Sequence, residues 1–288
     1  MEIQWYPGHM TKARRQMQED IKLIDLIIEL VDARAPQASR NPDIDELGRQ
    51  KARLILLNKS DMAEESANRQ WMEYFKKMGY HALQVDSRNK GSLKALGPLV
   101  AEACKAKLER DARRGIKNRP VRAMVVGIPN VGKSTFINSY AGRACAKTGN
   151  RPGVTKGKQW IRLGKGLELL DTPGILWPKF EDPKAGEYLA MIGSIKDDVV
   201  NTEELALGLI TYLAASYPGT LEARYQVGEG GTSLELLQGI AKNRKCIVRG
   251  NELSLEKAAG ILLDDFRSGK LGRITLEKVA AEEAECGK

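Results

Sequence analysis

The chain has 288 residues, of which 42% are hydrophobic, so it can bury a sizeable core and is not an intrinsically disordered protein. No apolar run approaches the roughly 20 residues that cross a bilayer, and the first residues, MEIQWYPGHM, form neither a signal peptide nor a transit peptide. The net charge is +9, and it is concentrated in residues 105–168, which hold 16 basic and 3 acidic side chains.

Four cysteines stand at positions 104, 145, 246 and 286, and no pair has the short spacing of a metal knuckle. Scattered cysteines in a chain without a secretory signal are typical of reduced thiols. We therefore expect a cytoplasmic protein.

The first two-thirds of the chain alternates short β-branched or leucine-rich runs with amphipathic charged runs. This alternation predicts an α/β fold with a doubly wound, mostly parallel sheet. Strands are predicted at residues 23–31, 54–57, 81–85, 123–126, 159–163 and 167–170. Helices are predicted at residues 11–20, 43–50, 64–78, 92–109 and 133–140.

Strand-like runs largely vanish after residue 180, and helical patterns replace them. We therefore expect two domains, residues 1–180 with the sheet and an N-terminal arm, and residues 181–288 as a smaller all-helical domain. Helices of this second domain are predicted at residues 185–192, 202–216, 233–242, 254–267 and 275–284.

A phosphate-binding loop is predicted at residues 127–134, GIPNVGKS, between an apolar strand and an amphipathic helix. Its glycines let backbone N–H groups approach phosphate oxygens, and the N-terminus of the helix adds positive potential. Lys133 would neutralise the β- and γ-phosphates, and the Ser134 hydroxyl would bind Mg²⁺. The residues expected to contact the nucleotide here are Gly127, Pro129, Asn130, Val131, Gly132, Lys133, Ser134 and Thr135.

Two further features predict contacts to the same Mg²⁺ and γ-phosphate. Asp171 begins a D-x-x-G sequence after an apolar strand, where its carboxylate would support Mg²⁺ and the Gly174 amide would sense the γ-phosphate. Thr155 precedes a strand in a segment rich in glycine and lysine, and we expect it to bind Mg²⁺ and the γ-phosphate. Lys133, Thr155 and Gly174 are therefore predicted to take part in catalysis, and Ser134, Thr155 and Asp171 to hold Mg²⁺.

An N-K-x-D sequence after another apolar strand predicts which base is bound. The Asp61 carboxylate can accept two hydrogen bonds from the N1–H and the exocyclic amine of guanine, a donor pair that adenine lacks. Lys59 would pack along the purine, and Asn58 would tie this loop to the phosphate loop. Ser87 and Arg88 follow a third strand and form a second predicted base loop. Because the carboxyl ends of parallel strands share one sheet edge, the motifs together predict a site for GTP or GDP.

The motifs stand in an unusual order, because the base-reading residues precede the phosphate loop. Strand pairing depends on position in space and not on chain order, so a circular permutation can build the same sheet. The chain then leaves the GTPase domain directly after Asp171 and Gly174 and enters the helical domain. Nucleotide-driven motion after Gly174 could therefore reorient that domain.

The sequence resembles the circularly permuted GTPases, and closely the bacterial ribosome biogenesis GTPase A family. The resemblance covers nearly the whole chain and rests on WYPGHM at 5–10, VDARAP at 31–36, NKSD, GIPNVGKS, PGVT and DTPG. It implies slow GTP hydrolysis that a ribosomal particle stimulates during assembly of the large (50S) ribosomal subunit. The implied partner is a precursor of that subunit, with its rRNA and ribosomal proteins. We expect no DNA, no membrane and a monomer off the ribosome.

The residue that orients the attacking water is not evident, because Ile175 occupies the position of the glutamine of Ras-like enzymes. The family pattern indicates His9, which could position or deprotonate water when a partner orders the N-terminal arm. The alternative is that His9 caps the first helix or packs beside Trp5.

Asn130 and Arg34 each have more than one interpretation. Asn130 resembles the asparagine of potassium-activated GTPases, whose side-chain oxygen helps to hold K⁺ beside the phosphates, and the alternative is a hydrogen bond that stabilises the loop. Arg34 could contact RNA, pair with Asp32 or act in phosphate chemistry.

Few of the charges in residues 105–168 are needed for GTP, so the others indicate either rRNA contact beside the nucleotide or a solvated basic face. The basic turn at 241–250 is likewise either a clamp for an RNA backbone or a solvated loop. Two rival functions stay open, a non-ribosomal signalling GTPase and an RNA-binding scaffold that uses GTP only structurally.

Overall fold

The computed structural model describes residues 15, 17–116, 119–146, 159–163, 166–172, 182–228, 230–248 and 250–279. Its centre is a six-stranded sheet with the strand order β3-β2-β1-β4-β6-β5. All neighbouring strands are parallel except β5 and β6. The strands are β1 (Leu26–Asp32), β2 (Ala52–Asn58), β3 (His81–Gln84), β4 (Val121–Gly127), β5 (Gln159–Leu163) and β6 (Leu167–Asp171). All six predicted strands and the α/β class are confirmed.

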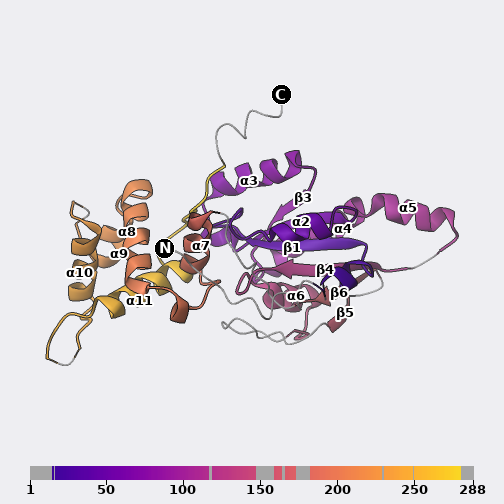
Figure 1. Cartoon of the computed structure of the whole chain (residues 1–288). Coiled ribbons are helices and arrows are strands. Elements are labelled where there is room, and N and C mark those ends of the chain that lie inside the picture. The colour runs from indigo at the N-terminus through magenta and orange to yellow at the C-terminus, as the bar shows by residue number, and fades with distance from the viewer. Residues whose placement is uncertain are drawn as a thin grey trace.

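The sheet is covered by helices on both faces, as the sequence pattern predicts (Figure 1). On one face, Val31 and neighbouring apolar residues pack against α3 (Glu65–Lys77), while Ile27 packs against α2 (Pro42–Leu47). The opposite face packs against α4 (Leu96–Ala103) and α6 (Lys133–Ala141). Because both faces are covered, all seven residues of β1 are buried.

One predicted helix, residues 92–109, is divided in the structure. A 3₁₀ turn, η2 (Lys90–Leu93), precedes α4, and α5 (Lys105–Arg113) follows after a break at Cys104. Pro98 lies in the first turn of α4. Backbone N–H groups there make no hydrogen bond within the helix, so the missing N–H of proline costs none. The segment is helical as predicted, but residues 92–109 span three separate elements, η2, α4 and α5, instead of one continuous helix.

The chain after the sheet is helical in all the predicted segments up to Arg267. Its elements are α7 (Pro183–Met191), η3 (Asp197–Val199), α8 (Thr202–Ser216), α9 (Thr220–Tyr225), α10 (Ser233–Asn243) and α11 (Leu255–Arg267). The short helix α9 was not predicted. Side chains cap the starts of the longer helices, with Asn201 accepting from two N–H groups of α8 and Thr232 and Glu235 forming a capping box on α10.

The predicted helix at 275–284 is wrong over the residues that the structure describes. Residues 275–279 form no helix, and their backbone N–H groups bind other parts of the chain. The Leu276 N–H donates to the carbonyl of Arg34 at 2.7 Å, and the Thr275 N–H donates to the hydroxyl of Tyr217 at 2.9 Å. These tertiary bonds replace the bonds that a helix would make. We call residues 272–279 the C-terminal strap.

The C-terminal strap lies across the loops that follow β1 and β2, next to α3 (Figure 1). The Ile274 N–H donates to the carbonyl of Met62 at 2.9 Å, and the Glu277 carboxylate accepts from the N–H groups of Gln37, at 2.7 Å, and Ala38. The indole N–H of Trp71 donates to the carbonyl of Glu277. The strap therefore joins the end of the helical region to the sheet loops.

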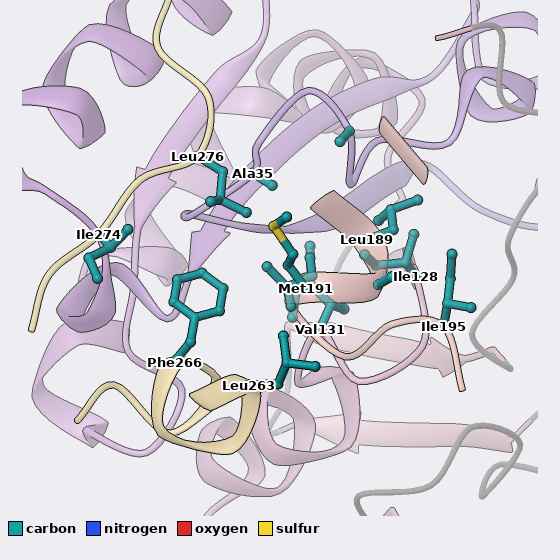
Figure 2. Close-up of a cluster of buried hydrophobic side chains, with 14 of the residues drawn as sticks. Ala35, Ile128, Val131, Leu189, Met191, Ile195, Leu263, Phe266, Ile274 and Leu276 are labelled. Carbon is teal, nitrogen blue, oxygen red and sulfur yellow. The ribbon is translucent and has the colours of Figure 1, made fainter. Parts of the chain in front are cut away.

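The hydrophobic core runs without interruption from the sheet into the helical region (Figure 2). Three groups of side chains meet there: Ala35, Ile128 and Val131 from loops of the sheet, Leu189, Met191, Ile195, Leu263 and Phe266 from the helical region, and Ile274 and Leu276 from the strap. The predicted domain boundary at residue 180 stays a prediction, since residues 173–181 lie outside the described part. None of the described helices is long and apolar enough to cross a membrane.

The strap predicts a pH dependence of stability. Burial raises the pKa of Glu277 from its ordinary 4.5 to about 7, although the Gln37 and Ala38 N–H groups oppose the shift. A carboxyl with a raised folded-state pKa contributes stability that is present below its unfolded pKa and is lost as the pH rises through the folded pKa. Urea unfolding should therefore show E277Q gaining stability relative to the unchanged chain, by about 1–3 kcal/mol, between about pH 5 and about pH 8.

The matched control is E235Q, at an exposed carboxylate whose pKa the Thr232 hydrogen bonds lower. Its stability relative to the unchanged chain should not rise over the same range. Parallel pH profiles for E277Q and the unchanged chain would contradict the assignment.

Candidate nucleotide site

The phosphate loop connects β4, in the middle of the sheet, to α6. Gly127 and Gly132 both have positive φ, at +151° and +102°, and a Cβ on either would collide with a neighbour. The neighbour is the Leu30 carbonyl for Gly127 and the Asn58 amide for Gly132. Both positions therefore require glycine, because only glycine permits this close approach of the loop to β1 and β2.

Lys133, the first residue of α6, is buried and points back into the loop. Its ammonium donates to the carbonyls of Gly127 at 2.9 Å and Ile128 at 3.0 Å. Burial lowers its pKa to about 8, and the nearby Asp171 carboxylate opposes that shift. A partly desolvated cation at the start of a helix is suited to exchange these carbonyls for phosphate oxygens.

Asp171 ends β6 beside the loop, with only 2% of its surface exposed. Its Oδ1 atom is buried and has no hydrogen-bond partner among the described residues. Burial raises the pKa of this carboxyl, while Lys133 and the Thr172 N–H act in the opposite direction. The Thr172 hydroxyl donates to the carbonyl of Val125 and fixes the strand end at 2.7 Å.

Asn58 joins three loops at the carboxyl edge of the sheet. Its amide nitrogen donates to the carbonyl of Val131 in the phosphate loop at 2.7 Å. Its Oδ1 accepts from the Ser87 N–H at 3.1 Å and the Ser87 hydroxyl at 2.7 Å. Asn58 therefore ties the N-K-x-D loop to the phosphate loop, as its sequence position predicts, and also to the loop after β3.

The base-reading loop continues from Asn58 into a 3₁₀ turn, η1 (Ser60–Met62). Lys59 precedes this turn with a φ of +58°, in the left-handed region, and its ammonium contacts the Asp32 carboxylate at 2.9 Å. Asp61 pairs with the Arg88 guanidinium, which also contacts Asp86. The other carboxylate oxygen of Asp61 is buried without a described partner. The loop thus presents a carboxylate with an acceptor oxygen to spare.

Comparison with known proteins identifies the family. A family profile described as "50S ribosome-binding GTPase" matches residues 122–214. The chain is 47% identical over 278 residues to ribosome biogenesis GTPase A of Bacillus cereus, which covers 96% of this chain and 94% of the relative. It is 31% identical to the Thermotoga maritima protein of the same name, over 96% of this chain and 94% of that protein. The chain belongs to the ribosome biogenesis GTPase A family.

Solved structures of this family agree with the fold. The GNP-bound YlqF crystal structure from T. maritima has a TM-score of 0.68 at 26% identity and covers 93% of this chain and 98% of that one. The GDP-bound YlqF structure has a TM-score of 0.67, with coverage of 92% and 99%. The chain is accordingly a circularly permuted GTPase of ribosome biogenesis, and the residues predicted to read the base precede the profile match that begins at residue 122.

The structure brings one set of predicted site residues together and leaves another outside the described part. Around the carboxyl edge of the sheet lie Asn58, Lys59, Asp61, Ser87, Arg88, Gly127, Pro129, Asn130, Val131, Gly132, Lys133, Ser134, Thr135 and Asp171. His9, Thr155 and Gly174 lie outside the described residues, so their predicted roles stay predictions.

Asn130 and Arg34 have specific partners in the structure. Asn130 adopts a φ of +58°, and its amide nitrogen donates to the carbonyl of Gly193 at 2.7 Å, after α7. This hydrogen bond is the loop-stabilising contact that is the alternative to K⁺ binding. It uses the side-chain nitrogen of Asn130 and not the side-chain oxygen. Arg34 forms the ion pair with Asp32 that was one of its three possible roles.

Asp32 is the site residue that sequence reasoning missed. It is fully buried at the end of β1, directly beside Asn58 in the strand register, and it contacts both Arg34 and Lys59. A signal for it was present, because an acidic residue at the end of a largely apolar strand needs a buried partner. The lysine that supplies this partner could not be identified from spacing alone.

The role of Asn58 generates a prediction. N58A leaves the Val131 carbonyl and the Ser87 groups without their partner, so the free energy of unfolding should fall by about 1–3 kcal/mol. The Kd for GDP should rise about tenfold, because the loops that it joins lose their relative position. Urea unfolding and calorimetric titration measure the two effects.

N201A is the matched control, since Asn201 caps α8 far along the chain from these loops. It should cost about 1 kcal/mol of stability as a lost helix cap, with an unchanged Kd for GDP. An unchanged Kd in N58A as well would contradict the role of Asn58.

Proposed function

We propose that this protein is a GTP-hydrolysing switch in the assembly of the large (50S) ribosomal subunit. In this proposal it acts in the cytoplasm, binds the precursor particle through rRNA and leaves after hydrolysis. The observation that carries the nucleotide part is the convergence of three loops on Asn58, which puts the base-reading and phosphate loops at one sheet edge. The ribosomal part is supported by the family and by the profile described as a 50S ribosome-binding GTPase.

The choice of guanine rests on the Asp61 carboxylate. One of its oxygens binds Arg88, and the other is buried without a described partner. Guanine would give that carboxylate two N–H donors, whereas adenine would leave a buried charge without them. Arg88 is 60% exposed and bound to two carboxylates, so it can swing away while it keeps Asp86.

The residues of the phosphate loop fit a Mg²⁺ ion that arrives with the nucleotide. Asp171 supplies a buried carboxylate oxygen without a described partner, and Ser134 supplies a hydroxyl at the start of α6. No cluster of three or more His, Cys, Asp and Glu side chains that could hold a metal occurs among the described residues. This donor set suits an ion that takes its other ligands from phosphates and water. Bound there, Mg²⁺ would neutralise charge on the phosphates.

The hydrolytic step in this proposal depends on groups that a partner brings into place. The position after Gly174 is Ile175, which cannot orient water. We assign that role to His9 on the N-terminal arm, with Thr155 and Gly174 contacting the γ-phosphate. Asn130 can offer its side-chain oxygen to K⁺, because only its nitrogen is bound to Gly193.

The rRNA contact is supported by exposed cations that GTP does not need. Most described basic side chains of residues 105–168 are exposed, and only Lys107 and Lys133 are buried. Exposed cations attract a phosphate backbone and bind it more weakly as salt increases. Most of these lie on α5 or near the start of β4, at the sheet edge opposite the phosphate loop. The exposed ones are Lys105, Arg110, Arg113, Arg114, Arg119, Arg122, Arg143 and Arg162.

The guanine assignment is tested by D61N with GDP and xanthosine diphosphate. Xanthine carries a carbonyl where guanine has its amine, so an amide at position 61 can donate to xanthine and loses its match with guanine. The Kd for GDP should rise about a hundredfold or more, and xanthosine diphosphate should become the preferred ligand.

D86N is the matched control, because Asp86 binds the same Arg88 from the neighbouring loop. It should keep the preference for GDP. A D61N protein that also keeps this preference would overturn the assignment of the base loop.

The switch function is tested by GTP turnover with and without purified large subunits, in potassium and in sodium salts. Turnover should be slow alone and should rise about tenfold or more with large subunits in potassium, because the particle orders the catalytic groups. H9A should bind GTP normally and lose the stimulation. Stimulation by anionic liposomes instead would favour a signalling GTPase, and assembly that persists in K133A would favour a passive scaffold.

A further inference from the structure

The predicted base-reading loop after β2 is held by the buried carboxylate of Asp32. Asp32 ends β1 beside Asn58 and accepts from the ammonium of Lys59 at 2.9 Å. Lys59 adopts a left-handed backbone conformation, which a lysine does not favour without such a restraint. The position of Lys59, and of η1 after it, therefore depends on where Asp32 points.

Asp32 is itself oriented by Arg34, which is 1% exposed. The guanidinium forms two parallel hydrogen bonds to the carboxylate, from Nε to Oδ1 at 2.9 Å and from Nη2 to Oδ2 at 2.8 Å. A bidentate pair of this kind fixes the plane of the carboxylate as well as its charge. Arg34 thus determines which lone pairs Asp32 can offer to Lys59.

The remaining nitrogen of the Arg34 guanidinium, Nη1, faces the end of α11. Nη1 donates to the carbonyl of Phe266 at 3.2 Å and lies 3.4 Å from that of Arg267, and the guanidinium lies over the Phe266 ring at 5.2 Å. These are the last residues of the helix, where carbonyl groups carry partial negative charge. Figure 2 shows Phe266 at this junction, beside the strap residues Ile274 and Leu276.

The charges explain why the end of α11 matters. Asp61 adds a second negative charge that acts on Lys59, while Arg34 and Lys59 both contact the single buried carboxylate of Asp32. Together they hold the pKa of Asp32 below its usual range despite its burial, so the carboxylate is ionised. The carbonyl groups at the end of α11 add negative potential beside the Arg34 guanidinium.

A second route joins the same helix end to the phosphate loop. Arg267 donates to the carbonyls of Ala190 at 2.8 Å and Met191 at 3.1 Å, at the end of α7. Gly193, two residues further, accepts from Asn130 of the phosphate loop. Both halves of the nucleotide site therefore contact α11 through a short series of buried or half-buried hydrogen bonds.

We propose that Arg34 is a positioning residue for guanine binding, and that through it the base-reading loop depends on the position of the C-terminal end of α11. The inference rests on the proposed guanine site and adds a means by which the helical region controls it. A partner that displaces α11 then weakens guanine binding without touching the nucleotide.

The test uses R34K in the full chain. Lysine keeps the positive charge but cannot serve two carboxylate oxygens and the helix carbonyls together. The Kd for GDP should rise about tenfold or more, and the preference for GDP over inosine diphosphate should shrink toward none. Inosine lacks the exocyclic amine, so the ratio of the two Kd values reports whether Asp61 is in place; loss of stability alone lowers both affinities equally.

R224K is the matched control, because Arg224 pairs with Asp265 of α11 within the helical region. It should keep the GDP-to-inosine ratio of the unchanged chain. If D61N loses its preference for GDP but R34K keeps the full ratio, the guanine site stands and the role of Arg34 is overturned. If D61N has no effect, the proposed function itself fails.

Hydrogen exchange in the unchanged chain tests the connection to α11 without relying on the folding of R34K. Saturating GDP should slow exchange of amides near residues 262–270 in the unchanged chain and in R224K. Exchange there that is indifferent to GDP in the unchanged chain would overturn the connection.

Discussion

The side-chain amide of Asn58 is the contact on which the rest of the nucleotide site depends. Asn58 ends β2, and its donor and acceptor atoms bind the loops that follow two other strands, β4 and β3. These loops are far apart along the chain, because whole helices and strands separate them. A single buried amide whose donor and acceptor are both bonded therefore fixes the relative positions of these loops. Lys59 follows Asn58 directly, so its position depends on the same contacts.

Circular permutation is possible because this shape is made by lateral contacts. In the sheet, β1 lies between β2 and β4, so the strand that begins the described sheet stands in its middle. Reordering the chain leaves the registers intact, while it changes which segments are continuous with the helical region. The chain enters that region from the phosphate side, after β6, and returns along the strap to the base side.

The central strands β1, β2 and β4 could be predicted from the sequence because they are short apolar runs that are mostly buried. The phosphate loop and the N-K-x-D motif could be predicted because each follows such a strand. The strap could not. Thr275–Val279 has a helical pattern, yet its N–H groups are taken by Arg34 and by Tyr217, far away in the chain. Arg34 had three possible roles for the same reason: the helix end that selects one of them lies more than two hundred residues later. Spacing within a motif indicates chemistry, whereas such distant partners appear only when the chain is folded.

The return of the strap gives the helical region two points of attachment, one to the phosphate loop through Gly193 and one to the loops after β1 and β2. The helical region is therefore attached to the sheet loops at two places and not through a single hinge. A rotation of the helical region must change at least one of these two sets of contacts. If the protein acts as proposed, such a rotation lets a bound particle change the affinity for the nucleotide without contacting the base.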